Sequence, residues 1–283
     1  MRTVTFKSVL HGAGHRMGLD PNTPDLTDEQ AISLTEFINT AVRRVWEHAH
    51  FPETILVEER HYRDDWNAAT AYAIADEVWL PAQEKYYTAL TANTNKDPAT
   101  ELTDWEESTD LRKYLPFSQI GKTDVDALIN AYQKDPRIIT APEKLYFKKT
   151  SDGYQFGRFA PDAVFIEYRA PAPQFTSSEY SAATQYAANA LAYVPTTGEC
   201  YKALVDTEGN DPTTSSDEWV KVDFPYFASD VVKEYAYSSL LIEDGEFSKA
   251  DKIRQNAEDL LIELEIIELE QQGQNERFSV RGI

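Results

Sequence analysis

The chain has 283 residues, of which 42% are hydrophobic, enough for one large hydrophobic core or several small ones. Its 48 acidic and 27 basic residues give a formal net charge of −21 at pH 7. So negative a surface repels phosphate backbones, which disfavours sequence-specific nucleic-acid binding. No stretch approaches the roughly 20 apolar residues of a membrane span, and the start lacks the apolar run of a secretory signal, so the cytoplasm is the expected compartment.

The first 63 residues predict two helices and a strand. A short helix is expected over residues 6–19, ended by Gly18. Thr27 and Gln30 have the spacing of a capping box, and the apolar residues that follow recur with helical spacing, which predicts an amphipathic helix over 27–49. A strand is expected over 54–62.

Two stretches, 66–105 and 180–219, align without a gap, each residue of the first matching the residue 114 positions later. Thirteen of the 40 aligned pairs are identical, beginning with AATAYA at 68–73 and AATQYA at 182–187. A fixed register over this length indicates a duplicated module of about 40 residues, and we call its copies the first and the second repeat. Cys200, the only cysteine, aligns with Tyr86, so we expect it to occupy a packing position.

The segment between the repeats predicts one helix and three strands. The spacing of Val125, Leu128, Ile129 and Tyr132 predicts a short helix that stops before Pro136. LYFKK, the turn SDG and YQFGRF predict a hairpin, and AVFIEYR alternates apolar and other residues as a strand does before Pro171 ends it.

The last segment predicts helices over 228–242 and 248–272, joined by the turn EDGE, and then an extended tail. The second helix has an apolar stripe by which we expect it to pack along one face. The acidic residues from Glu258 to Glu270 indicate a solvated helix face, which in a ring could border the lumen.

Together these elements predict an α+β fold with N- and C-terminal helices around a central β-rich part. Two small all-β modules, at 64–107 and 178–221, would interrupt a body made of 1–63, 108–177 and 222–283.

The repeats resemble the small chitin-binding-type carbohydrate-binding modules. The resemblance rests on an aromatic residue, a Thr-x-Tyr, a Tyr-x-Ala, an Asp-Pro and a closing tryptophan, here Trp105 and Trp219. It implies glycan contacts, because sugar rings stack on flat aromatic surfaces. The candidate contacts are Trp66, Tyr72 and Trp79 in the first repeat and Tyr180, Tyr186 and Tyr193 in the second. The aromatic pair that such modules usually carry after Tyr-x-Ala is replaced by Leu90 and Thr91 and by Leu204 and Val205, and we expect both closing tryptophans to be core residues.

The rest of the chain resembles the head-to-tail connector (adaptor) proteins of tailed bacteriophages. The resemblance rests on RRVWEHAHFPET, DVDALINAYQKDPR, VFIEYRAPAPQF and the closing ADKIRQNAEDLLIELEIIELEQQGQNERFSV. It implies a ring of identical subunits, commonly twelvefold, in the neck of the virion between the portal protein and a tail or neck protein, with DNA only passing through the lumen. Assembly would use the C-terminal helix and arm, through Ile253, Leu260, Leu261, Leu264, Ile267, Phe278 and Val280.

Catalytic and metal-binding functions are disfavoured. His11 and His15 would share one face of a helix, but no cysteine or carboxylate cluster completes a metal site. Glu58 and Glu59, or Glu106 and Glu107, could be named as a glycosidase pair, but carboxylates are too abundant for such a pair to be informative and no catalytic barrel has room. We expect neither an enzyme nor a cofactor.

The sequence therefore favours a structural virion protein, a head-to-tail adaptor assembled in the host cytoplasm, with two outward-facing modules. The alternative is a glycan-binding protein that attaches to surface polysaccharide through both modules at once.

Overall fold

The computed structural model describes residues 2–16, 18, 27–109 and 111–271, and the chain divides into two compact units. Unit 1 comprises residues 1–53 and 172–283, and unit 2 comprises residues 54–171. The fold is mixed helix and sheet, as the sequence predicts. The expected body is divided between the two units, and the module boundaries at 64–107 and 178–221 stay a prediction.

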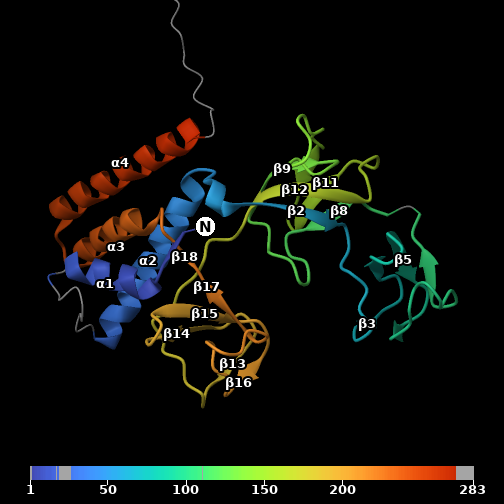
Figure 1. The fold of residues 1–283 in the computed structure, drawn as a ribbon, viewed down its shortest axis with the longest axis horizontal. Helices are drawn as coiled ribbons and strands as arrows, with labels where there is room; N and C mark the ends of the chain where they lie inside the picture. The colour runs from blue at the N-terminus through green and yellow to red at the C-terminus, as the bar shows by residue number, and fades with distance from the viewer. Residues whose placement is uncertain (1, 17, 19–26, 110, 272–283) are drawn as a thin grey trace, which may run out of the picture. The chain divides into compact units, whose positions relative to one another are not determined.

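The described residues of unit 1 form four α-helices, whose arrangement Figure 1 shows. They are α1 (Phe6–Arg16), α2 (Asp28–His48), α3 (Ser229–Glu243) and α4 (Phe247–Gln271). The capping box that begins α2 is confirmed, since the Gln30 backbone N–H donates to Thr27 Oγ1 and the Gln30 side chain accepts from the Thr27 N–H. Strands β1 (Thr3–Val4) and β18 (Phe224–Pro225) pair beside the helices.

The core of unit 1 lies between the helices. Helix α3 packs against α1, α2 and α4, so it is the central helix. The apolar stripe of α2 is buried there with Phe6, Phe175 and Phe224. The Phe175 ring contacts the rings of both Phe6 and Phe224. An ion pair from Arg44 to Glu258 and a hydrogen bond between His48 and Glu265 join α2 to α4 at the surface. No helix among the described residues is long and apolar enough to cross a bilayer.

Unit 2 contains two three-stranded antiparallel sheets outside the first repeat. One has the order β2 (Ile55–His61), β12 (Ala163–Arg169), β9 (Ala127–Tyr132), and the other β10 (Phe147–Lys149), β11 (Gly153–Phe156), β8 (Tyr114–Pro116). Alternate residues of β12, namely Val164, Ile166 and Tyr168, are fully buried in the core. The predicted hairpin and the strands at 54–62 and in AVFIEYR are confirmed.

The helix expected over 125–132 is wrong, because residues 127–132 form strand β9. Their apolar spacing fits a helix, but β9 pairs along the edge of β12, with Phe165 opposite Tyr132. This pairing provides hydrogen-bond partners for the backbone N–H and C=O groups of β9 and buries Ala131 and Tyr132. Long-range strand pairing therefore overrides the local pattern.

The strands of the two repeats occupy matching positions. The first repeat has β3 (Ala71–Tyr72), β4 (Glu77–Leu80), β5 (Lys85–Ala89), β6 (Asn93–Thr94) and β7 (Trp105–Glu107). The second has β13 (Gln185–Tyr186), β14 (Leu191–Val194), β15 (Glu199–Ala203), β16 (Thr207–Glu208) and β17 (Trp219–Val222). In each, a two-stranded and a three-stranded sheet enclose the closing tryptophan, so the core position expected for both tryptophans is confirmed.

The repeats also share their left-handed backbone positions. Ala75 and Asn189 both have φ of +70°, and Glu84 and Gly198 have φ of +53° and +73°. Asn95 at +56° matches Gly209 at +78°. The second repeat carries glycine or asparagine at each of these positions, the residues that adopt this conformation at least cost.

Gly198 is a position of close contact between the second repeat and α1. Its carbonyl accepts from the Lys7 N–H at 2.9 Å, and a Cβ on Gly198 would lie 2.7 Å from the Lys7 Cβ. We expect Gly198→Ala to destabilise unit 1 by about 1–2 kcal/mol, because alanine resists a positive φ and Lys7 must move. The labelling rate of Cys200 by a thiol reagent in mild urea checks this, with a rise of about tenfold expected.

Cys200 suits this measurement because it is fully buried, and burial raises the pKa of its thiol to about 12, so it reacts only when unit 1 opens. Glu84→Gly, at the equivalent position of the first repeat, is the control and should leave the rate unchanged. Equal labelling of wild type and Gly198→Ala would contradict a steric role for this glycine.

Candidate functional site

Two of the six candidate glycan contacts, Trp79 and Tyr193, are buried, with exposed fractions of 4% and 8%. Trp79 stacks on His61, with the ring centroids 4.1 Å apart. Its counterpart Tyr193 packs edge-on against Phe6, at 5.9 Å. Residues outside each repeat thus cover this face of its three-stranded sheet, and neither ring presents a flat surface to a sugar in this structure.

A third candidate, Tyr72, belongs to the core of the first repeat. Its ring lies 5.2 Å from that of Trp105 in an edge-to-face arrangement. Its hydroxyl oxygen accepts from the Asn67 N–H at 2.7 Å, which holds the chain next to Trp66. Tyr186 makes the equivalent contact with the Ser181 N–H but is only half-buried.

Trp66 and Tyr180, which are equivalent in the two repeats, are both half-buried. Tyr180 stacks on Tyr186, with the ring centroids 5.7 Å apart. The Trp66 Nε1 and the Tyr180 hydroxyl are buried without a hydrogen-bond partner among the described residues. Of the predicted contacts, Trp66, Tyr180 and Tyr186 therefore retain ring surface that a ligand could reach.

Trp66 and Tyr72 line a cavity of about 590 Å³ within unit 2. Its wall is completed by residues outside the repeat, among them Arg63, Arg112 and Tyr114. The volume is in the range of small-molecule sites. Asp64, Asp65, Asp76 and Glu77 outnumber the two arginines in the lining, so the cavity suits a neutral or cationic ligand better than an anion.

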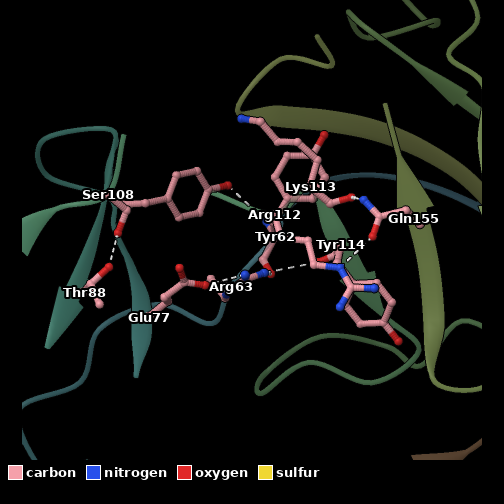
Figure 2. A network of polar contacts seen from close by, with 10 residues as sticks. Tyr62, Arg63, Glu77, Thr88, Ser108, Arg112, Lys113, Tyr114 and Gln155 are labelled. Carbon is pink, nitrogen blue, oxygen red and sulfur yellow. Dashed lines mark hydrogen bonds and ion pairs between the residues drawn. The ribbon is translucent and has the colours of Figure 1, made fainter. Parts of the chain in front are cut away.

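Arg63 joins the first repeat to the rest of unit 2 beside this cavity (Figure 2). Its Nε donates to Glu77 Oε2 at 2.7 Å, and its Nη1 donates to the carbonyls of Tyr62 and Tyr114 at 2.7 and 3.4 Å. Arg112 is held in the same network, since its Nε donates to Gln155 Oε1 and its guanidinium lies 5.1 Å from the Tyr114 ring centroid. Both arginines are thus fixed before any ligand enters.

Tyr86 makes the second connection between the repeat and the sheets of unit 2. Its hydroxyl oxygen accepts from the Tyr62 N–H at 3.0 Å, and its O–H donates to the Asp162 carbonyl. Sequence reasoning did not identify Arg63, Tyr86, Arg112 or Tyr114 as site residues. The sequence does contain a signal for Tyr86, which aligns with Cys200 of the second repeat. A position at which the two repeats carry different residues indicates a contact that each repeat makes with its own surroundings.

Burial raises the pKa of Tyr62 and of Tyr86 far above the ordinary value for tyrosine. A folded-state pKa above the unfolded one near 10 adds stability that is complete below about pH 10 and is lost as the pH rises further. The Tyr62 hydroxyl has no hydrogen-bond partner among the described residues, so Tyr62→Phe removes the titration without breaking a bond.

We expect Tyr62→Phe to unfold like wild type near pH 9 and to resist urea better than wild type near pH 11, by about 1 kcal/mol. Urea unfolding followed by tryptophan fluorescence at both pH values measures the difference. Tyr146→Phe is the matched control, because Tyr146 is exposed and its replacement should change neither midpoint. Identical alkaline behaviour of Tyr62→Phe and wild type would refute the assignment.

The candidate assembly residues of α4 divide into two groups. Leu261 is buried against the core of unit 1, with Leu264 and Ile253 partly buried. Leu260 and Ile267 are exposed. Phe278 and Val280 lie outside the described residues.

The described residues contain no group of three or more histidine, cysteine or acidic side chains arranged to hold a metal ion. What the arrangement offers chemically is a preformed cavity with one aromatic wall, fixed guanidinium groups and an excess of carboxylates. Comparison of the chain with protein-family models, with curated proteins and with solved structures finds no match in any of the three.

Proposed function

We propose that the protein is a structural virion component, a head-to-tail adaptor that forms a ring of identical subunits between the portal and the tail. Helix α4 carries this proposal. It packs on unit 1 through buried residues such as Ala250, Ala257 and Leu261, while Ile262, Ile266, Leu260 and Ile267 remain exposed. Exposed isoleucines and leucines along a helix are typical of a surface that another protein covers.

Charge supports the same function. The chain has 48 acidic and 27 basic residues, which give a formal net charge of −21 at pH 7. An acidic wall lets DNA pass without binding, because it repels the phosphates. The expected partners are further copies of the chain, the portal protein above and a tail or neck protein below, with assembly in the host cytoplasm and the repeats facing outward.

Quantitative mass spectrometry of density-purified phage particles tests this function. We expect about twelve copies of the chain per particle when it is counted against the major capsid protein, as a closed ring would require. Absence of the chain from particles would refute the adaptor function.

A glycan-binding function is the second candidate, favoured by the half-buried rings of Trp66, Tyr180 and Tyr186. Glycan-array binding that is lost in Trp66→Ala and Tyr180→Ala, but retained in Leu102→Ser, would support it. Leu102 is an exposed apolar residue of the first repeat that none of the aromatic contacts involves. A silent array would count against this candidate without affecting the adaptor.

A further inference from the structure

Ile138, Tyr146 and Phe159 are among the large apolar side chains that unit 2 exposes on its loops. Ile138, Tyr146 and Phe159 have exposed fractions of 79%, 97% and 86%. The loop that carries Ile138 is closed at its base by hydrogen bonds from the Gln133 N–H to the Glu143 carbonyl and from the Leu145 N–H to the Ala131 carbonyl. Its returning arm leads directly into Tyr146, the residue before β10.

Phe159 lies at the same end of the β10–β11 hairpin as Tyr146. Phe147 and Phe156 are paired at this end, with Tyr146 just before the first and the turn from Gly157 to Ala160 just after the second. Since side chains alternate along a strand, Tyr146 and Lys148 point away from the side on which Phe147 meets the core. The rings of Tyr146 and Phe159 are thus exposed to solvent and take no part in the core of unit 2.

Basic side chains accompany these rings. Lys134, Lys148 and Arg158 are exposed and form no ion pair with a described residue, and the Arg158 guanidinium lies 4.5 Å from the Phe159 ring centroid. Between Lys134 and Arg158 the chain has six basic and three acidic residues, although its net charge is −21. We call these residues the loop surface: Lys134, Ile138, Tyr146, Lys148, Arg158 and Phe159.

Helix α4 has a complementary face in unit 1. Asp259, Ile262, Glu263 and Ile266 are spaced i, i+3, i+4 and i+7, so they share one side of the helix, and all four are exposed. Ala257 and Leu261, which pack on the core, lie on the other side by their spacing along the helix. We call these four residues the outer face of α4, which alternates two carboxylates with two isoleucines.

We infer that the loop surface of one copy docks on the outer face of α4 of a second copy. Each surface combines exposed large apolar groups with charge, and the charges are opposite in sign, which favours this pairing over the contact of either surface with itself. The two surfaces differ, so the contact is heterologous, and repeating such a contact closes a ring when the rotation per subunit allows. The inference rests on the proposed ring and specifies its subunit interface.

The test uses two charge-reversed full-length chains. One carries Lys134→Glu, Lys148→Glu and Arg158→Glu, and the other carries Asp259→Lys and Glu263→Lys. In each chain alone, like charges would face one another, and we expect the concentration for half-assembly to rise about tenfold or more. In an equal mixture every contact regains opposite charges, so assembly should return. Multi-angle light scattering over a concentration series measures both effects.

A control variant, Glu106→Lys, reverses an exposed charge on the first repeat and should assemble like wild type. Cross-linking of mixed light and heavy isotope-labelled wild-type chains distinguishes a contact between copies from one within a single chain. Mixed-isotope links between the loop surface and α4 support the inference, and links only within one isotope overturn it.

The outcomes separate this interface from the proposed function. If wild type and both reversed chains form the same ring, the interface is wrong and the ring stands. If the reversed chains assemble only when mixed but the chain is absent from virions, the interface stands and the adaptor function fails. Wild type that stays monomeric throughout the series overturns the interface.

Discussion

Replacing Arg60 with methionine is expected to lower the free energy of unfolding of unit 2 by about 3–5 kcal/mol. The Arg60 side chain is completely buried, and it pairs with Glu58 at 2.9 Å. Its Nη2 donates to the Thr123 carbonyl at 2.6 Å and to the Tyr168 hydroxyl at 3.0 Å, and its Nη1 donates to Gln119 Oε1 at 3.3 Å.

The size of this effect follows from what the substitution leaves behind. Methionine fills much of the volume but donates no hydrogen bond, so the Thr123 carbonyl and the buried Gln119 amide lose their partner. These hydrogen bonds attach the loop before β9 to strand β2, so the substitution should destabilise both elements.

Hydrogen exchange at increasing urea measures the effect, because peptides from β2, β9 and β12 report unit 2 separately from unit 1. Arg137→Met is the matched control. Arg137 pairs with Asp135 at the surface, where an ion pair contributes at most about 1 kcal/mol. If Arg60→Met exchanged no faster than Arg137→Met, the buried network would not stabilise the unit.

Replacing either closing tryptophan with alanine should lower the free energy of unfolding of the unit that contains it by about 3–5 kcal/mol. Trp105 and Trp219 are 1% and 3% exposed, and each indole N–H donates to a backbone carbonyl, of Lys96 at 2.9 Å and of Asn210 at 3.1 Å. The substitution therefore opens a cavity and leaves a carbonyl unpaired.

The same exchange experiment separates the two variants by location. Trp105→Ala should expose β5 and leave β15 protected, while Trp219→Ala should do the reverse. Trp66→Ala, at a half-buried ring of the first repeat, is the control and should cost less than Trp105→Ala. Equal costs for those two variants would contradict the central position of the closing tryptophan.

The sequence predicted the elements whose signals are local. Thr27 and Gln30 determine where α2 begins through their own side chains. In β12, apolar residues alternate with other residues because successive side chains of a strand point to opposite sides. Residues 125–132 had a misleading local pattern, since the spacing of Leu128 and Tyr132 fits a helix. Pairing with β12 determines the strand, and that partner lies more than thirty residues further along the chain.

The candidate site was less predictable for a related reason. The repeat alignment identified Trp105 and Trp219 as core, because the contacts that bury them lie inside each repeat. Trp79 and Tyr193 are buried by His61 and Phe6, which lie outside the repeats and differ from each other in type. An alignment of two copies contains no information about the surroundings that the copies do not share.

The division of the chain affects how it folds during synthesis. Unit 2 is one continuous segment, so it can fold as soon as it has emerged from the ribosome. Helices α1 and α2 are made first but pack on α3, which follows unit 2 in the chain. At roughly 5–20 residues per second, the apolar side of α2 waits on the order of ten seconds for its partner. The nascent chain should therefore be a chaperone client during this interval, and a circular permutant that begins at Ala172 would shorten it.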